Sequence, residues 1–213
     1  MTYARQLDTS VDPPRTARYD GPGFEAVKPD IREALALEQR GVCCYCNDRI
    51  RSDPSGMKIE HRVAQSMDEA RDLEWSNLLG ACRGELSSPS GRGANVLHCD
   101  SSKGDQAIDI DPTNATHIAC LFYEPGGTLR SSRPNHQDEI NGVLNLNVLP
   151  LRERRTRVLA VVQLELNKRF GARTLPKVQV KRLLELYRSP RGDQPPFVGF
   201  LCWWLERAQR KAV

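Results

Sequence analysis

The chain has 213 residues, of which 39% are hydrophobic and 27% are charged, a composition ordinary for a water-soluble globular protein. No window approaches the run of about 18 apolar residues that a membrane helix needs, and residues 1–20 lack the apolar core of a secretory signal, so we expect a cytoplasmic protein. The net charge of +4 is unevenly placed, because residues 150–213 hold 15 lysines and arginines against 5 acidic residues. A polyanionic partner and a merely solvated surface both fit this basic half.

The first segment in chain order is expected to be an extended arm. Residues 1–29 are rich in Pro, Gly, Asp and Arg and show no apolar period. A helix should follow, with Asp30 as its N-cap and Glu33 completing a capping box, and it should end at Gly41.

A small, irregular α+β module is expected over residues 30–111. It holds strand-like pieces over residues 57–63 and 75–81, broken by polar loops, and a helix that starts near Asp100. Residues 87–95 lack any large apolar side chain and predict a mobile loop.

The last part, residues 112–213, is expected to form a mainly helical, basic lobe. Apolar residues recur there at spacings of three and four, which predicts three amphipathic helices. The stripes are Leu159, Val162, Leu166 and Phe170, then Val180, Leu183, Leu184 and Tyr187, then Phe197, Leu201, Trp204, Leu205 and Ala208. We interpret Tyr187, Trp203 and Trp204 as packing residues in preference to platforms for base stacking.

The cysteines predict a structural zinc site. In a reducing compartment, seven cysteines favour metal binding or core filling over disulfide bonds. The C-x2-C turn of Cys43 and Cys46 can aim two thiolates at one tetrahedral ion, and Cys82 and Cys99 are the candidates for the other half of the site. Four unrelated buried cysteines remain the alternative.

The other cysteines are less informative. Cys44 stands beside a proposed ligand and could replace Cys43, although the C-x2-C spacing counts from Cys43. Cys120 and Cys202 lie in apolar runs and are expected to fill the core.

An ordered series of polar residues lies between and around the cysteines. Lys58-Ile59-Glu60-His61 ends a strand-like run, Trp75-Ser76-Asn77-Leu78 follows, and His98-Cys99-Asp100-Ser101-Ser102-Lys103-Gly104 completes the series. A Glu-His pair alone is weak, but the fixed order of cysteine pair, Glu-His, Asn-Leu, cysteine, Asp and Lys-Gly is more specific.

Over residues 43–104 this series resembles the HNH nuclease superfamily, in its branch with cysteine knuckles around the active site. The resemblance implies a ββα-metal module, in which two strands and a helix hold one divalent cation, here with a zinc knuckle and followed by the helical lobe. It implies that Glu60 and Asp100 bind the catalytic metal, that His61 is the general base and that Asn77 orients it. Glu60 replaces the commoner Asp and Asp100 replaces the final histidine, and both are hard oxygen donors that suit Mg²⁺ or Mn²⁺ better than zinc.

Several basic residues could either contact a ligand or be ordinary solvated residues. Lys103, one helical turn after Asp100, could contact a flanking phosphate or be a solvated lysine. His98 is a weaker rival for a metal ligand, and His117 and His136 are expected to be ordinary surface residues. A basic run opens the first helix of the lobe and could line a nucleic-acid path, meet an acidic partner or be solvated; its members are Arg152, Arg154, Arg155 and Arg157.

Across most of the chain the resemblance extends to the HNH subunits of Septu-type and retron-associated anti-phage systems, the PtuB family. It implies a hetero-oligomeric defence complex with an ABC-type, PtuA-like ATPase and, in the retron-associated systems, with a reverse transcriptase and its RNA and DNA. DNA is the favoured substrate. RNA, including transfer RNA, is an alternative substrate, and a zinc-stabilised adaptor that binds a partner or nucleic acid without cleaving it is an alternative function.

Overall fold

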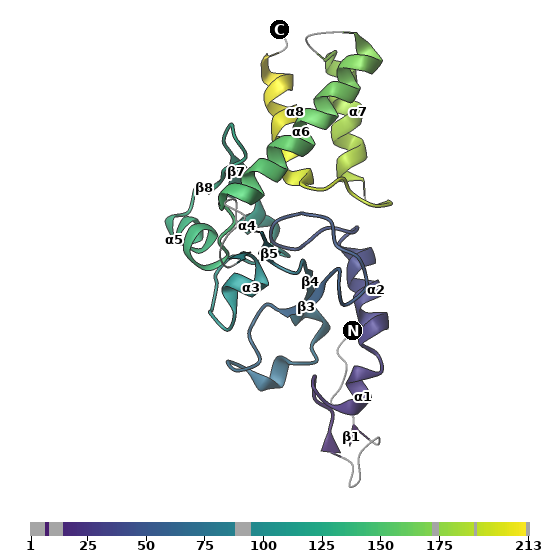
Figure 1. Cartoon of the computed structure of the whole chain (residues 1–213), viewed down its shortest axis with the longest axis vertical. Coiled ribbons are helices and arrows are strands. Elements are labelled where there is room, and N and C mark those ends of the chain that lie inside the picture. The colour runs from purple at the N-terminus through teal and green to yellow at the C-terminus, as the bar shows by residue number, and fades with distance from the viewer. Residues whose placement is uncertain (1–6, 9–14, 88–94, 172–174, 190, 212–213) are drawn as a thin grey trace.

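The computed structural model describes residues 7–8, 15–87, 95–171, 175–189 and 191–211, and it mixes helices with small sheets (Figure 1). The helices are α1 (Pro22–Glu25), α2 (Lys28–Glu38), α3 (Asp100–Lys103), α4 (Ala115–Ala119), α5 (Pro134–Asp138), α6 (Leu149–Phe170), α7 (Lys177–Arg188) and α8 (Val198–Lys211). Each sheet found in the described ranges is an antiparallel pair: β1 (Leu7–Asp8) with β2 (Arg15–Thr16), β3 (Lys58–His61) with β4 (Leu78–Ala81), β5 (Glu85–Leu86) with β6 (Val96–Leu97), and β7 (Leu121–Tyr123) with β8 (Leu129–Ser131). Short 3-10 turns lie at Glu69–Arg71 and Trp75–Asn77, and a π-helical turn lies at Glu139–Val143.

The elements are arranged along one long axis (Figure 1). Helices α6, α7 and α8 form a bundle at one end, and α1 and β1 lie at the other. The β3–β4 pair lies between them, with α2 on one side and α3 on the other. None of the helices in the described residues is both long and apolar enough to cross a bilayer.

The helix expected from Asp30 is present, but its start was predicted wrongly. Helix α2 begins at Lys28 with Pro29 in its first turn, and no side chain caps it. Proline already has the helical φ and needs no hydrogen-bond partner at this position, so it starts the helix without a capping residue. The end is close to the prediction, because Gly41 has a left-handed φ of 71° and its amide donates to Ala36 O at 2.8 Å.

The hairpin of β3 and β4 carries the acidic and histidine residues of the polar series. Its register places Glu60 opposite Leu79 and His61 opposite Leu78. The strand pieces were therefore predicted at the correct places, although Trp75–Asn77 is a 3-10 turn and not strand. The helix expected near Asp100 is the single turn α3. Of the predicted loop at 87–95, residues 88–94 lie outside the described residues.

Two hydrophobic clusters hold the described chain together. The first contains buried residues of α2, the β3–β4 pair and the cysteine turns, and it also takes in Ile140, Leu144 and Leu151 from beyond the predicted boundary at residue 112. The second lies among the three C-terminal helices; its buried members are Leu166, Leu175, Val180, Leu184 and Leu205. Members of all three predicted stripes thus meet in the second cluster, whereas Leu159 and Phe197 pack in the first.

The aromatic residues of these helices pack, as predicted. Tyr187 and Trp204 lie against the second cluster and Trp203 against the first. Cys202 also packs on the second cluster, whereas Cys120 is partly exposed and belongs to neither, so its assignment to the core was wrong.

Candidate functional site

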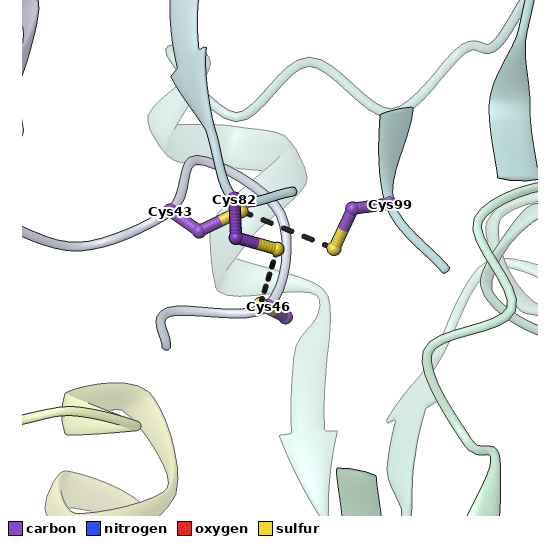
Figure 2. A group of neighbouring side chains, drawn as sticks. All are labelled: Cys43, Cys46, Cys82 and Cys99. Carbon is purple, nitrogen blue, oxygen red and sulfur yellow. Dashed lines mark hydrogen bonds between the residues drawn. The ribbon is translucent and has the colours of Figure 1, made fainter. Parts of the chain in front are cut away.

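Four buried cysteines from three segments of the chain converge at one point (Figure 2). Cys43 and Cys46 come from the turn after α2, Cys82 follows β4 and Cys99 precedes α3. Cys43 Sγ lies 3.9 Å from Cys99 Sγ, Cys46 Sγ lies 3.8 Å from Cys82 Sγ, and all four sulfurs lie within 4.8 Å of one another.

These distances fit a tetrahedral zinc site. Zinc–sulfur bonds of about 2.3 Å place the corners of a tetrahedron about 3.8 Å apart. Disulfide-bonded sulfurs would be only about 2.05 Å apart. The four cysteines expected from the sequence are therefore brought together, and they could hold a zinc ion.

Local backbone geometry builds the first half of this cluster. The Cys43 amide donates to Asp48 O at 2.8 Å and Asn47 adopts a left-handed φ of 60°, so the chain that carries both thiols reverses tightly over residues 43–48. The amide of Asp48 also donates to Cys46 Sγ at 3.4 Å. A C-x2-C turn of this kind leaves both sulfurs on one side.

The two rival ligands are outside the four-sulfur group. Cys44 is not among the sulfurs that lie within 4.8 Å of one another. His98 Nδ1 lies 3.1 Å from Cys99 Sγ, and burial lowers the pKa of His98 to about 4. The neutral ring of His98 therefore contacts one of the four cysteines, Cys99, and is not itself one of the four grouped ligands.

Glu60, which is buried, and Asp100, which is partly buried, form a carboxyl pair beside it. Glu60 Oε1 accepts from Tyr45 Oη at 2.8 Å and lies 2.9 Å from Lys103 Nζ. The side chain of Glu60 is also hydrogen-bonded to that of Asp100, whose Oδ2 lies 3.1 Å from Lys58 Nζ. Two carboxyl groups and two lysines thus share one site.

Burial divides the charge of this pair unequally. Burial and the neighbouring Asp100 together raise the pKa of Glu60 to about 8, although the charge of Lys103 opposes them. Burial acts in the same direction on Asp100, but hydrogen bonding to Glu60 and the charge of Lys58 outweigh it and hold the pKa of Asp100 below its ordinary value. The two side chains therefore hold one proton between them at neutral pH, with Glu60 carrying it.

His61, the next residue in β3, faces different partners. Its Nε2 lies 2.9 Å from Asp72 O. A carbonyl only accepts, so Nε2 carries the ring proton and Nδ1 keeps its lone pair. Gln65 Nε2 lies 3.3 Å from Nδ1, and the Tyr19 ring meets the imidazole edge-on at 4.5 Å between centroids. Burial lowers the pKa of His61, which favours the neutral base.

The side chain of Asn77 was expected to orient the imidazole of His61, but its hydrogen bonds go to the backbone. Its Oδ1 accepts from the Val63 amide at 2.8 Å, and its Nδ2 donates to Val63 O at 3.0 Å and Arg71 O at 3.1 Å. The expected orienting contact is replaced by a backbone one. Asn77 thus holds two backbone positions of the loop between β3 and β4 by hydrogen bonds. The same loop supplies the Asp72 carbonyl that orients His61.

Lys103 is neither solvated nor on the surface. Only 1% of it is exposed, and Nζ donates to His61 O at 3.1 Å while it pairs with Glu60. Its charge is needed inside the protein, because the buried Glu60 and the partly buried Asp100 would be costly without a counter-charge. The expected phosphate contact has no support in this geometry.

Of the basic run of α6, Arg155 is buried, Arg152 is partly exposed, and Arg154 and Arg157 are exposed. Arg155 is fully buried and donates from Nη1 to Gly127 O at 2.9 Å and Leu146 O at 2.8 Å. Arg154 pairs with Asp48 at 2.8 Å, whereas Arg157 is exposed. Arg155 therefore cannot line a nucleic-acid path.

Sequence reasoning missed several residues of these sites. Tyr45 lies between the first two cysteines, and Lys58 lies two residues before Glu60 and so on the same strand face, which was a usable signal. His136 was expected at the surface but is fully buried, and it groups with Asp109 and His117. Nothing in the local sequence connects these three.

Comparisons with known proteins add no family assignment, since no protein-family model and no curated protein matches the chain.

Proposed function

We propose that the chain is a metal-dependent HNH endonuclease that hydrolyses phosphodiester bonds, with DNA as the favoured substrate. One observation carries the proposal: the carboxyl groups of Glu60 in β3 and Asp100 in α3 are hydrogen-bonded beside the strand neighbour His61. An antiparallel strand pair followed by a short helix supports the same interpretation, because it is the layout expected of a ββα-metal module.

Glu60 and Asp100 fit a hard divalent cation. Both offer oxygen atoms, the donors that Mg²⁺ and Mn²⁺ prefer. Their shared proton reflects the cost of placing two carboxylates together, a cost that a divalent charge would offset. Such a cation would stabilise the negative charge that develops on the phosphate and the departing oxygen.

His61 is suited to act as the general base. Its ring is neutral and its Nε2 proton is held on Asp72 O, so Nδ1 can take a proton from an attacking water. Asn77 acts through the loop as a positioning residue.

Cleavage assays on matched variants test this proposal. Incubation of the full chain with Mg²⁺ or Mn²⁺ and plasmid DNA should give cleavage, and His61→Ala should reduce its rate by about 10²–10⁴-fold. Asp100→Asn should also abolish cleavage, whereas Asp105→Asn, an exposed carboxylate close to the same helix, should not. Equal activity of the parent and a folded, zinc-loaded His61→Ala variant would refute the assignment.

The same assay separates the alternatives by substrate. Cleavage of RNA or transfer RNA in place of DNA would move the proposal to an RNA nuclease with the same residues. Binding of nucleic acid without cleavage in the parent chain would favour the zinc-stabilised adaptor.

On the resemblance to the PtuB family, we further propose that the chain is the effector of an anti-phage complex with an ABC-type ATPase. Co-expression with the ATPase encoded beside its gene, followed by pull-down, tests this directly. Failure to recover the pair would contradict the complex without bearing on the nuclease chemistry.

A further inference from the structure

A second group of potential metal ligands lies apart from the cysteines. Asp109 follows α3 in a loop, His117 lies in α4 and His136 lies in α5. Each offers one ligand atom, and these atoms all lie within 4.8 Å of one another. Three separate segments therefore bring a carboxylate and two imidazoles to one point.

The burial of His136 is not explained by its hydrogen bond. The residue is fully buried, and its Nε2 lies 2.9 Å from Asp109 Oδ2. An imidazolium paired with Asp109 would donate from both ring nitrogens, yet Nδ1 is buried without a partner among the described residues. An ion pair with Asp109 therefore leaves one nitrogen of the buried ring without a hydrogen-bond partner among the described residues.

A neighbouring side chain positions the Asp109 carboxylate, and His117 offers a nitrogen with a lone pair. Asn135 Nδ2 donates to Asp109 Oδ2 at 2.8 Å, which fixes the carboxylate. The Asp111 amide donates to His117 Nδ1 at 3.2 Å, so this nitrogen bears the lone pair. An ion ligated by Nδ1 would replace this long hydrogen bond. A supporting hydrogen bond such as that from Asn135 to Asp109 is usual around metal ligands.

The group also reaches solvent. The side chain of Asp109 is 50% exposed and His117 is partly exposed, whereas His136 is buried. Three protein ligands at a surface leave at least one coordination position open, as in catalytic metal sites.

We propose that Asp109, His117 and His136 form a second, open metal site that takes a divalent transition-metal ion. Two imidazoles and one carboxylate suit Zn²⁺, Fe²⁺ or Co²⁺ better than Mg²⁺, which prefers oxygen, and differ from the four thiolates of the cysteine cluster. The open position would bind water or a small anionic ligand. This site is independent of the proposed nuclease chemistry.

Cobalt titration of the zinc-loaded full chain tests the proposal. We expect one Co²⁺ per chain to bind while zinc is retained, with a visible spectrum that lacks thiolate charge-transfer bands. Asp109→Asn and His117→Gln should each weaken this binding at least about ten-fold. These two residues are chosen because His136 is buried and its loss could prevent folding.

Two controls locate the bound cobalt. Asp138→Asn alters an exposed carboxylate on α5 and should bind Co²⁺ as the parent does. A Glu60→Gln, Asp100→Asn double variant should also retain it, which separates this site from the carboxyl pair. The proposal is overturned if the parent binds no Co²⁺ beyond the cysteine cluster, or if Asp109→Asn and His117→Gln both bind it with unchanged affinity.

Discussion

Arg155 and Arg157 belong to the same basic run of α6, but they have different surroundings. The guanidinium of Arg155 donates to two backbone carbonyls and lies over the rings of Tyr123 and Phe197, with centroid distances of 5.7 and 6.0 Å. The buried cation thus joins the start of α6 to the loop after β7. Two residues along the helix, Arg157 faces solvent.

Replacing these two arginines should separate structural from surface roles. Arg155→Ala removes the partners of two buried carbonyls and leaves a cavity, so we expect it to lower the free energy of unfolding by roughly 3 kcal/mol or more. Arg157→Ala should change it by less than about 0.5 kcal/mol. Urea denaturation of both variants measures the difference, and equal stabilities would contradict the structural role of Arg155.

Asn77 gives a second prediction at the same scale. Asn77→Ala leaves two carbonyls and one amide of the β3–β4 loop without their partner, and we expect a loss of about 3 kcal/mol of stability. The Val63 amide should also exchange its hydrogen faster, a change that hydrogen exchange detects at one position. Asn167→Ala, on an exposed face of α6, is the control and should leave both quantities unchanged.

At the scale of elements, the segment before α1 covers the candidate base. Arg18 Nε pairs with Asp72 Oδ2 at 3.0 Å, and Tyr19 packs against His61. Lys28 Nζ in turn lies 4.0 Å from the centroid of the Tyr19 ring. The predicted arm therefore docks, at least over these residues, on the loop that orients His61.

Removing the Tyr19 ring should uncover His61. We expect Tyr19→Ala to increase the rate at which diethyl pyrocarbonate modifies His61, because the imidazole loses the ring that packs against it. Tyr19→Phe keeps the ring and should protect His61 as the parent does. Peptide mass spectrometry measures both rates, with the buried His98 as an internal reference. An unchanged rate in Tyr19→Ala would show that the ring does not shield the histidine.

At the scale of the whole molecule, the cysteine cluster lies where distant parts of the chain meet. The Cys99 amide donates to Leu144 O at 2.8 Å, and the Phe197 amide donates to Asn47 O at 2.6 Å. The cluster therefore joins the β3–β4 unit to the segments before α6 and α8. Removing a metal ion from the cluster should therefore also destabilise the segments before α6 and α8.

Cys82→Ser tests this dependence against a matched cysteine. We expect the parent to hold about one tightly bound zinc per chain, and Cys82→Ser to lose both the zinc and cooperative unfolding, because zinc binding and folding of such a site are coupled. Cys120→Ser, partly exposed and outside the cluster, should retain both. Metal analysis and thermal unfolding give the result, and retention of zinc and stability in Cys82→Ser would contradict the zinc site.

The sequence by itself determined the local features. The three-and-four spacing of apolar residues located α6, α7 and α8, and the C-x2-C spacing located the turn that aims two thiols together. The strand-like run over residues 57–63 similarly placed Glu60 and His61 on a short strand. These patterns are readable because helix and strand periods and tight turns depend on neighbours in the chain.

Only the tertiary structure decided which side chains meet and which are buried. It brought Glu60 to Asp100 and placed Lys103 inside as their counter-charge. It also showed that Asn77 bonds to the loop backbone and not to the imidazole. It also grouped Asp109, His117 and His136, although no sequence period links them. Packing between distant segments sets burial, and burial sets the pKa and partners of each polar group, so these properties depend on contacts that a local pattern does not contain.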